Sequence, residues 1–411
     1  MNGKCFETAG ATRPKYRGAF AAVIVLAAVM AAALAASAIA GVSSSRSAQP
    51  WTVTPVASGL DSPRGLAITS SGQLLVGEAG HGGDVCVSAG PLGQDCTGTT
   101  SLIAKVNTAT GATAPLVSGL YSTSVTLEGV TGVDGIATAA GKQVGAMTGY
   151  PQHYDGWTCA GQPADCPAVL AAARGQAGKL IEFTDAGTWS PVADIGASDY
   201  QLTVTDPSLS DPLDGPNANP YGVLPLAAGT WVADAGSNML DFVPNGGKPI
   251  VASHVPNPAQ RGFPGDAVPT CVAMIRGNLY AADLAGRLWK RNGSYTPTEL
   301  PLTGTDGKPL LHHVTGCVSD GLEHIYLVDM WGTPGPPIPA GPGSTAGTGS
   351  VVEFSRKTPP VVIAQGLDFP NGITLAKDGS LYVTVGSTCT AKGTPFPYCA
   401  KGGSIVRLRS S

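Results

Sequence analysis

Charged side chains are scarce in this chain of 411 residues, of which only 13% are Asp, Glu, Lys or Arg. This is about half the share that is usual in globular domains. The scarcity argues against a helical protein, whose surface needs Glu and Lys, whereas 56 glycines and 34 prolines suit many short strands joined by turns. The formal charge of −4 and the lack of a basic cluster argue against a nucleic-acid partner.

Common catalytic signatures are also missing from the sequence. It contains no G-x-S-x-G nucleophile elbow, no Walker loop and no Rossmann fingerprint in the right context. None of its six histidines forms an H-x-x-x-H pair, and no C-x2-C spacing occurs, which argues against a structural zinc site. Motifs alone therefore do not name a reaction.

The first forty residues differ in kind from the rest. Four basic residues precede an apolar run from Gly18 to about Ala40. This pattern predicts an export signal or, because the run is slightly long, an uncleaved anchor helix. We therefore expect a signal peptide or membrane anchor at 1–40, a linker at 41–50 and the folded domain at 51–411. The protein is expected to be secreted or extracytoplasmic, with membrane contact only through its N-terminal segment.

Apart from Cys5, the chain has eight cysteines, an even number that indicates disulfides in an oxidising compartment. Three pairs are close in sequence, and the two remaining cysteines would form a fourth. The expected pairs are Cys86 with Cys96, Cys159 with Cys166, Cys389 with Cys399, and Cys271 with Cys317. Two buried free thiols are the alternative for the last pair.

One stretch of the sequence occurs twice, at a constant offset of 307 residues. Gly59–Val76 reads GLDSPRGLAITSSGQLLV, and Gly366–Val383 reads GLDFPNGITLAKDGSLYV. A unit that repeats across the whole chain indicates a repeat architecture. Each unit has the pattern of four short strands separated by Gly-containing turns, which is typical of one β-propeller blade.

Strand counting predicts six blades. The expected second strands are Gln73–Glu78, Lys142–Met147, Thr230–Asp234, Asn278–Asp283, His324–Asp329 and Ser380–Val385. The expected third strands are Ser101–Asn107, Lys179–Thr184, Met239–Val243, Arg287–Lys290, Ser350–Phe354 and Ser404–Leu408. The last blade lacks a fourth strand, and Trp51–Ala57 is a spare one. The prediction is an all-β, six-bladed β-propeller of four-stranded antiparallel blades, closed by its N-terminal strand and monomeric.

The long loops are predicted to gather on one side of the disc, which we call the loop-rich face. They follow second strands or lead into the next blade, at Ala79–Thr100, Thr148–Gly178, Asp199–Pro220, Pro256–Val268, Gly304–Val314, Met330–Gly349 and Gly386–Gly403. Three of the cysteine pairs fall in them. Because function concentrates on loops held by a rigid scaffold, we expect a small molecule, glycan or partner protein to bind there.

Four second strands end in an acid at one equivalent position: Glu78, Asp234, Asp283 and Asp329. In one interpretation these carboxylates bind a divalent cation such as Ca²⁺ above the channel. In the other, each acid accepts backbone N–H bonds from its own turn. No cofactor beyond such a cation is expected.

A second candidate set lies at the mouth of the channel, immediately before each innermost strand. Its members are Arg64, Asp134, Tyr221 and Asn371, whose position makes them candidate ligand-binding residues. His153 is a further candidate, because Tyr150–Trp157 (YPQHYDGW) is rich in aromatic residues that suit stacking on a ring or sugar. The same composition also suits a loop that packs on itself.

Two stretches carry a resemblance to a known family. Gly59–Gly83, with its PRG turn and E-x-G-x-GG segment, resembles the opening of ScyD/ScyE family proteins. Asn219–Leu240 resembles the central blade of that family and, more loosely, NHL repeats. The resemblance implies an exported six-bladed propeller, and cyanobacterial members are associated with an extracellular indole-phenol pigment.

Two functions follow as hypotheses. The first is a binding scaffold that holds its ligand on the loop-rich face. The alternative is a cation-dependent enzyme of oxidative tailoring or lactone hydrolysis, with its site at the channel mouth. The motif of the regucalcin/gluconolactonase family is only partly present at Asn371–Val385, where Val385 replaces the final Asp, and this departure weakens the lactonase hypothesis.

Overall fold

The computed structural model describes residues 51–90, 93–126, 129–209, 215–259, 265–337, 343–391 and 397–410. The expected signal or anchor at 1–40 and the linker at 41–50 lie outside the described residues. Within the described ranges, no helix is both long and apolar enough to cross a membrane.

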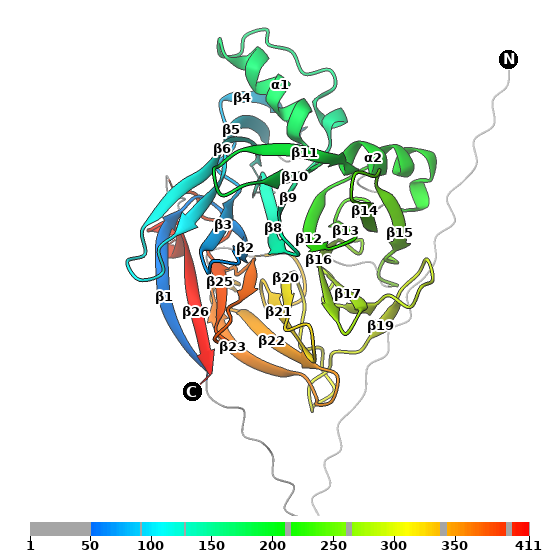
Figure 1. Cartoon of the computed structure of the whole chain (residues 1–411). Coiled ribbons are helices and arrows are strands. Elements are labelled where there is room, and N and C mark those ends of the chain that lie inside the picture. Colours follow the sequence, from blue (N-terminus) through cyan, green and yellow to red (C-terminus); the bar gives the residue numbers. More distant parts are fainter. Residues whose placement is uncertain are drawn as a thin grey trace, which may run out of the picture. The chain divides into compact units, whose positions relative to one another are not determined.

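Six antiparallel sheets form the blades of a β-propeller, as predicted (Figure 1). Blade one contains β2 (Pro63–Ile68), β3 (Leu74–Glu78), β5 (Gln94–Val106) and β6 (Thr113–Val125), with β4 (Val85–Ser88) and β7 (Gly129–Thr131) added on β5 and β6. Blade two contains β8 (Val133–Ala139), β9 (Lys142–Met147), β10 (Lys179–Phe183) and β11 (Trp189–Asp194). Blade three contains β12 (Pro220–Leu226), β13 (Gly229–Asp234), β14 (Met239–Pro244) and β15 (Ile250–His254).

The remaining three blades have the same plan. Blade four contains β16 (Pro269–Ile275), β17 (Asn278–Asp283), β18 (Leu288–Lys290) and β19 (Thr298–Leu300). Blade five contains β20 (Val314–Ser319), β21 (His324–Asp329), β22 (Gly349–Ser355) and β23 (Val361–Leu367). Blade six contains β24 (Ile373–Leu375), β25 (Leu381–Val385), β26 (Gly403–Ser410) and the N-terminal β1 (Trp51–Leu60). The innermost strands contact one another in sequence from β2 to β24, and β24 contacts β2.

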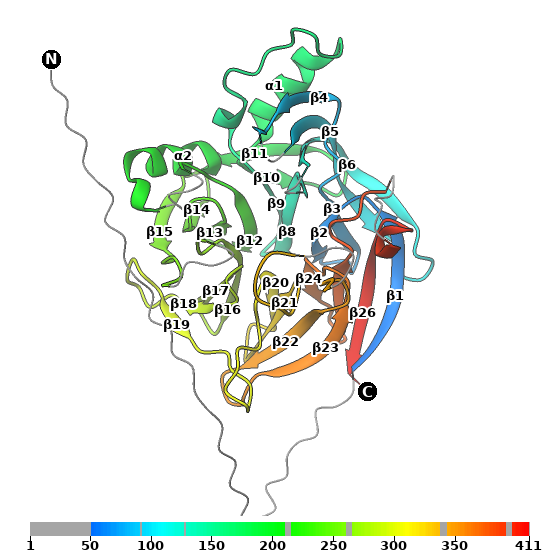
Figure 2. The ribbon, with the colours of Figure 1, turned by 180° about the vertical axis from the view of Figure 1, so that it is seen from behind.

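The N-terminal strand closes the ring. β1 pairs antiparallel with β26, from Trp51 opposite Ser410 to Leu60 opposite Gly403. The two strands lie side by side in blue and red in Figures 1 and 2. Because β1 occupies the free edge of β26, the last blade gains its fourth strand and the junction keeps no unpaired inner edge.

The hydrophobic core lies between neighbouring blades rather than at the centre of the disc. In β3, all five residues from Leu74 to Glu78 are buried, as expected for a strand covered on both faces. Between blades two and three, Val144 and Leu180 pack against Val232 and Val243. Each blade therefore buries its apolar side chains against the next one.

In the described part of the chain, the connections between strands contain two helices, α1 (Cys166–Gln176) and α2 (Ile195–Thr205). They also contain the short 3₁₀ turns η2 (Pro151–Tyr154), η3 (Pro207–Leu209) and η4 (Pro397–Cys399). The predicted long loops at Thr148–Gly178 and Asp199–Pro220 contain helical residues that the sequence did not suggest, α1 in the first and the end of α2 in the second. The Asp194 side chain caps α2 by accepting from the Ala197 N–H, and Ile195 is buried beneath it. Tertiary packing, rather than a strong helical periodicity, explains this helix.

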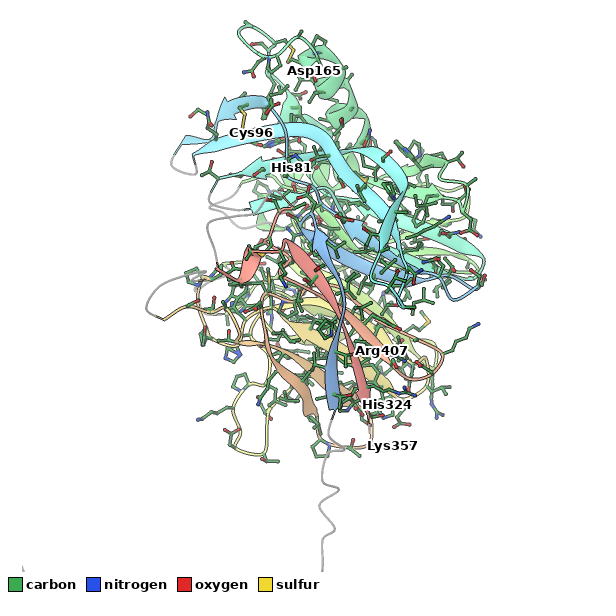
Figure 3. All side chains as sticks on the ribbon, turned by 90° about the vertical axis from the view of Figure 1, so that its left-hand side faces the viewer. His81, Cys96, Asp165, His324, Lys357 and Arg407 are labelled. Carbon is green, nitrogen blue, oxygen red and sulfur yellow. A yellow bond between two sulfur atoms is a disulfide. The ribbon has the colours of Figure 1, made fainter. Side chains whose placement is uncertain are left out.

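Four disulfides are present, in the four predicted pairs. Cys271 in β16 and Cys317 in β20 join the innermost strands of blades four and five, with their Cα atoms 5.7 Å apart. The disulfides indicate an oxidising environment. In the side view of Figure 3, His81 and Cys96, which both lie within the predicted loop Ala79–Thr100, are at the upper left, whereas His324 and Arg407 are at the lower right.

Candidate functional site

The residues at the channel mouth sit in β-bulges of the innermost strands. In each of the first five blades, strand pairing shifts register where the candidate residue stands, and the side chain is left out of the ladder. Bulges redirect side chains in this way. The six equivalent residues are Arg64, Asp134, Tyr221, Thr270, Thr315 and Asn371, the last standing just before β24. Thr270 and Thr315 were missed in the sequence analysis. Their place directly before Cys271 and Gly316, the same blade position as the other four mouth residues, could have identified them.

A glycine follows the mouth residue in every blade except the fourth, where Cys271 stands. A Cβ atom on Gly135 would lie 2.0 Å from the carbonyl oxygen of Tyr221, and one on Gly372 would lie 2.2 Å from that of Arg64. Only glycine allows neighbouring innermost strands to approach so closely. The repeated glycine therefore permits this close approach in the five blades that carry it.

The structure brings the four predicted mouth residues together. Arg64 Nε lies 3.3 Å from Asp134 Oδ1, and Arg64 also donates from Nη2 to the Val130 carbonyl. Across the mouth, Asn371 Nδ2 donates to the Tyr221 hydroxyl oxygen at 2.7 Å. A cavity of about 60 Å³ opens among Asp134, Tyr221, Asn371 and the two threonines. Four separate blades thus supply one polar cluster.

Asp134 is the least satisfied residue of this cluster. Its side chain is 1% exposed, yet among the described residues neither carboxylate oxygen accepts a hydrogen bond. Burial raises the pKa of Asp134 to about 6, and the nearby Arg64 charge opposes the rise. Burial likewise raises the pKa of Tyr221 to about 12. At neutral pH the mouth therefore holds an anionic acceptor beside a protonated phenol.

His153 lies outside this cluster and lines a different cavity. Its Nε2 atom is 2.6 Å from Asp95 Oδ2, and the Thr123 hydroxyl donates to the other Asp95 oxygen. The cavity of about 190 Å³ is lined by Asp95, His153 and the rings of three tyrosines, Tyr121, Tyr150 and Tyr154. Asp95 went unnoticed in the sequence because nothing there connects it with a histidine 58 residues later.

Each of the four acids that end second strands accepts hydrogen bonds from backbone or side-chain groups near it. Asp234 Oδ1 accepts the backbone N–H groups of Asn219, Gly236 and Ser237. Asp329 accepts those of His312 and His313, and Glu78 accepts that of Asp61.

Asp283 is bound by the Arg287 backbone and side chain and by the Trp289 indole. Burial raises the pKa of Glu78 to about 7, and those of Asp283 and Asp329 to about 6. Within the described ranges, no group of three or more His, Cys, Asp or Glu side chains could hold a metal ion. Each of the four acids thus accepts hydrogen bonds from its own turn or from neighbouring groups, which is the arrangement expected of the turn-cap interpretation.

Two buried acids that the sequence did not suggest lie beside Asp234. Asp199 comes from α2 and Asp241 from β14, and all three carboxyls are fully buried. Ser237 connects two of them by donating from its hydroxyl to Asp199 and from its backbone to Asp234. Burial, together with the negative charge of the other carboxyls, raises the pKa values of Asp199 and Asp241 well above the usual range. These carboxyls therefore retain protons that exposed acids lose.

No protein-family model matches the chain, and no curated protein matches it in sequence. Solved structures do resemble it. A gluconolactonase from Xanthomonas campestris aligns with a TM-score of 0.50 and 9% sequence identity, and the alignment covers 90% of this chain and 93% of the gluconolactonase chain. A protein of unknown function from Bacteroides thetaiotaomicron aligns with a TM-score of 0.52 and 8% sequence identity, and the alignment covers 88% of this chain and 76% of the Bacteroides chain. At such identity the likeness shows the propeller fold alone.

Proposed function

We propose that this chain is an exported binding protein that holds a hydroxylated small molecule, such as a sugar or polyol, at the channel mouth. The observation that carries the proposal is the buried Asp134 carboxylate, which lacks a hydrogen-bond donor in the described protein. The Arg64 guanidinium 3.3 Å away compensates part of the charge, but the hydrogen bonds that water would donate to the carboxylate are not replaced, which is costly. A ligand that donates to Asp134 would remove this cost.

The neighbouring phenol supplies the complementary group. The Tyr221 oxygen accepts from Asn371, so its own hydrogen is left to donate. One ligand hydroxyl could thus donate to Asp134 and accept from Tyr221. This pairing favours alcohols over anions and over purely apolar molecules. The cavity of about 60 Å³ is small, so it would take only the hydroxyl-bearing end of such a ligand.

The alternative of a cation-dependent enzyme has less support from the geometry. Its expected ligands, Glu78, Asp234, Asp283 and Asp329, are each held by their own turns or neighbouring side chains. A cation at these acids remains a prediction for metal analysis of the purified protein. The gluconolactonase neighbour supplies one reason to include a sugar acid among the probes.

Saturation-transfer NMR with D-glucose, D-gluconate and myo-inositol tests the proposal. We expect D-glucose or myo-inositol to receive saturation from the wild type, and the anionic D-gluconate to receive less. Tyr221→Phe and Asp134→Asn should strongly reduce the transfer to the neutral polyol that binds. Tyr295→Phe is the control, because Tyr295 is exposed and belongs to an outer loop of blade four. The proposal fails if neither D-glucose nor myo-inositol binds, or if both mouth variants bind as well as the control.

A further inference from the structure

We propose that the cavity beside His153 is a second binding site, for a single neutral planar ring that carries one O–H or N–H donor. The cavity measures about 190 Å³ and has tyrosine rings among its walls. An apolar protein cavity of about 150 Å³ is known to hold benzene. The space beside His153 therefore suits one ring and a small substituent.

The walls of this cavity are held in place before any ligand arrives. Tyr121 donates from its hydroxyl to the Thr148 carbonyl at 2.5 Å. Tyr150 stacks on Tyr200 of α2, with ring centroids 4.7 Å apart, and Tyr154 meets Tyr121 edge-on. Packed rings in these arrangements present fixed faces and edges. A ring ligand would lose little affinity to reordering of the site.

The His153–Asp95 pair determines which chemical group the ligand must carry. A carboxylate only accepts hydrogen bonds, so the imidazole nitrogen facing Asp95, Nε2, carries the proton. The Thr123 hydroxyl occupies the other oxygen and fixes the carboxylate. In the neutral imidazole, Nδ1 is then an acceptor, and it has no hydrogen-bond partner among the described residues. The ligand group that fits is a donor.

The charge of the site favours a neutral ligand. Among the described residues that line the cavity none is Lys or Arg, whereas Asp95 is one of them. An anionic ring such as benzoate would meet the Asp95 carboxylate without a compensating cation. A phenol meets the requirement, since it offers a planar ring and an O–H donor without charge.

This site is separate from the channel mouth. Strand β7 divides the two, because Gly129 and Thr131 line the His153 cavity while the carbonyl of Val130 accepts from Arg64 at the mouth. The second site thus does not depend on the proposed sugar site. The two can be tested independently on one folded protein.

Titration of the full folded domain with phenol, toluene and benzoate tests the proposal. We expect phenol to bind about ten-fold more tightly than toluene, the effect of one hydrogen bond, and benzoate to show no binding. His153→Ala should weaken phenol about ten-fold and leave toluene unchanged. Equal affinity of phenol and toluene for the wild type, or absence of phenol binding, would overturn the proposal.

Two control variants distinguish loss of binding at this cavity from effects of a substitution elsewhere in the protein. His324 is a matched histidine, because it also pairs with an aspartate (Asp320, 2.8 Å) and its side chain is 33% exposed against 37% for His153. His324→Ala and Tyr221→Phe should leave phenol affinity unchanged. If His153→Ala also loses toluene binding, the cavity has collapsed in this variant. Nitrogen-15 NMR of His153 in the wild type then decides whether phenol donates to Nδ1. Phenol should then move the Nδ1 resonance upfield, and an unmoved resonance would overturn the proposal.

Discussion

Replacement of Asp241 by Asn should stabilise the protein at neutral pH. Asp241 is fully buried beside Asp199 and Asp234, and neither of its oxygens has a donor among the described residues. Burial and the charge of Asp199 raise its pKa well above 3.8. The Asn amide has nearly the same shape, carries no charge, and can donate to Asp199 as the protonated Asp241 carboxyl does.

The magnitude follows from proton linkage. A carboxyl whose pKa is raised in the folded state contributes full stability below its unfolded pKa of about 3.9, and loses it as pH rises through the folded value. Each pH unit in that window costs about 1.4 kcal/mol per carboxyl. Asp241→Asn removes one such titration, so we expect a gain of roughly 1–3 kcal/mol at pH 7 and little change at pH 4.

Urea unfolding followed by tryptophan fluorescence between pH 4 and pH 8, with the disulfides intact, measures this gain. Asp306→Asn is the control, because that carboxyl is 61% exposed and its loss should not alter the pH slope. A variant less stable than the wild type at pH 7 would refute the reasoning. If millimolar Ca²⁺ also stabilised the wild type but not the variant, the three carboxyls would be ionised around a cation.

Three further changes test other parts of the structure. Cys271→Ser combined with Cys317→Ser opens a link across 46 residues and should cost about 4 kcal/mol in urea unfolding; an unchanged unfolding midpoint would show that the cross-blade link contributes nothing. Deletion of residues 51–60 removes β1 and exposes the edge of β26, so light scattering should detect aggregation and the Tm should fall. Arg64→Met removes the charge that lowers the pKa of Asp134, so carbon-13 NMR should find that pKa above about 6.

The sequence was sufficient for the fold because its repeat is regular. Apolar strands recur between Gly-containing turns, so the predicted bounds of the second strands β9, β17 and β21 match those observed. Ring closure also followed from counting strands. The last blade lacked a fourth strand and the chain had a spare strand at its start, so the first strand was expected to complete the last blade. Helix α2 was missed because its periodicity is weak and its helical state depends on burial of Ile195 and capping by Asp194.

The site was predictable only where it follows the repeat. The positions of Arg64, Asp134, Tyr221 and Asn371 came from blade alignment, and the structure places them around one mouth. Asp95 could not be found in the same way, because its pairing with His153 depends on how two long loops fold over one another. The group of Asp199, Asp234 and Asp241 likewise joins a helix to two strands and has no counterpart in the repeat.

The most direct test of the proposed function is a carbon-13 NMR titration of the Asp134 carboxyl with and without a saturating polyol. A ligand hydroxyl that donates to the carboxylate favours its charged form and must lower the pKa of Asp134 below about 6. By linkage, polyol affinity should then rise as the pH increases through that pKa. An Asp134 pKa that stays unchanged in the presence of a bound polyol would contradict the proposal that the ligand sits at the channel mouth.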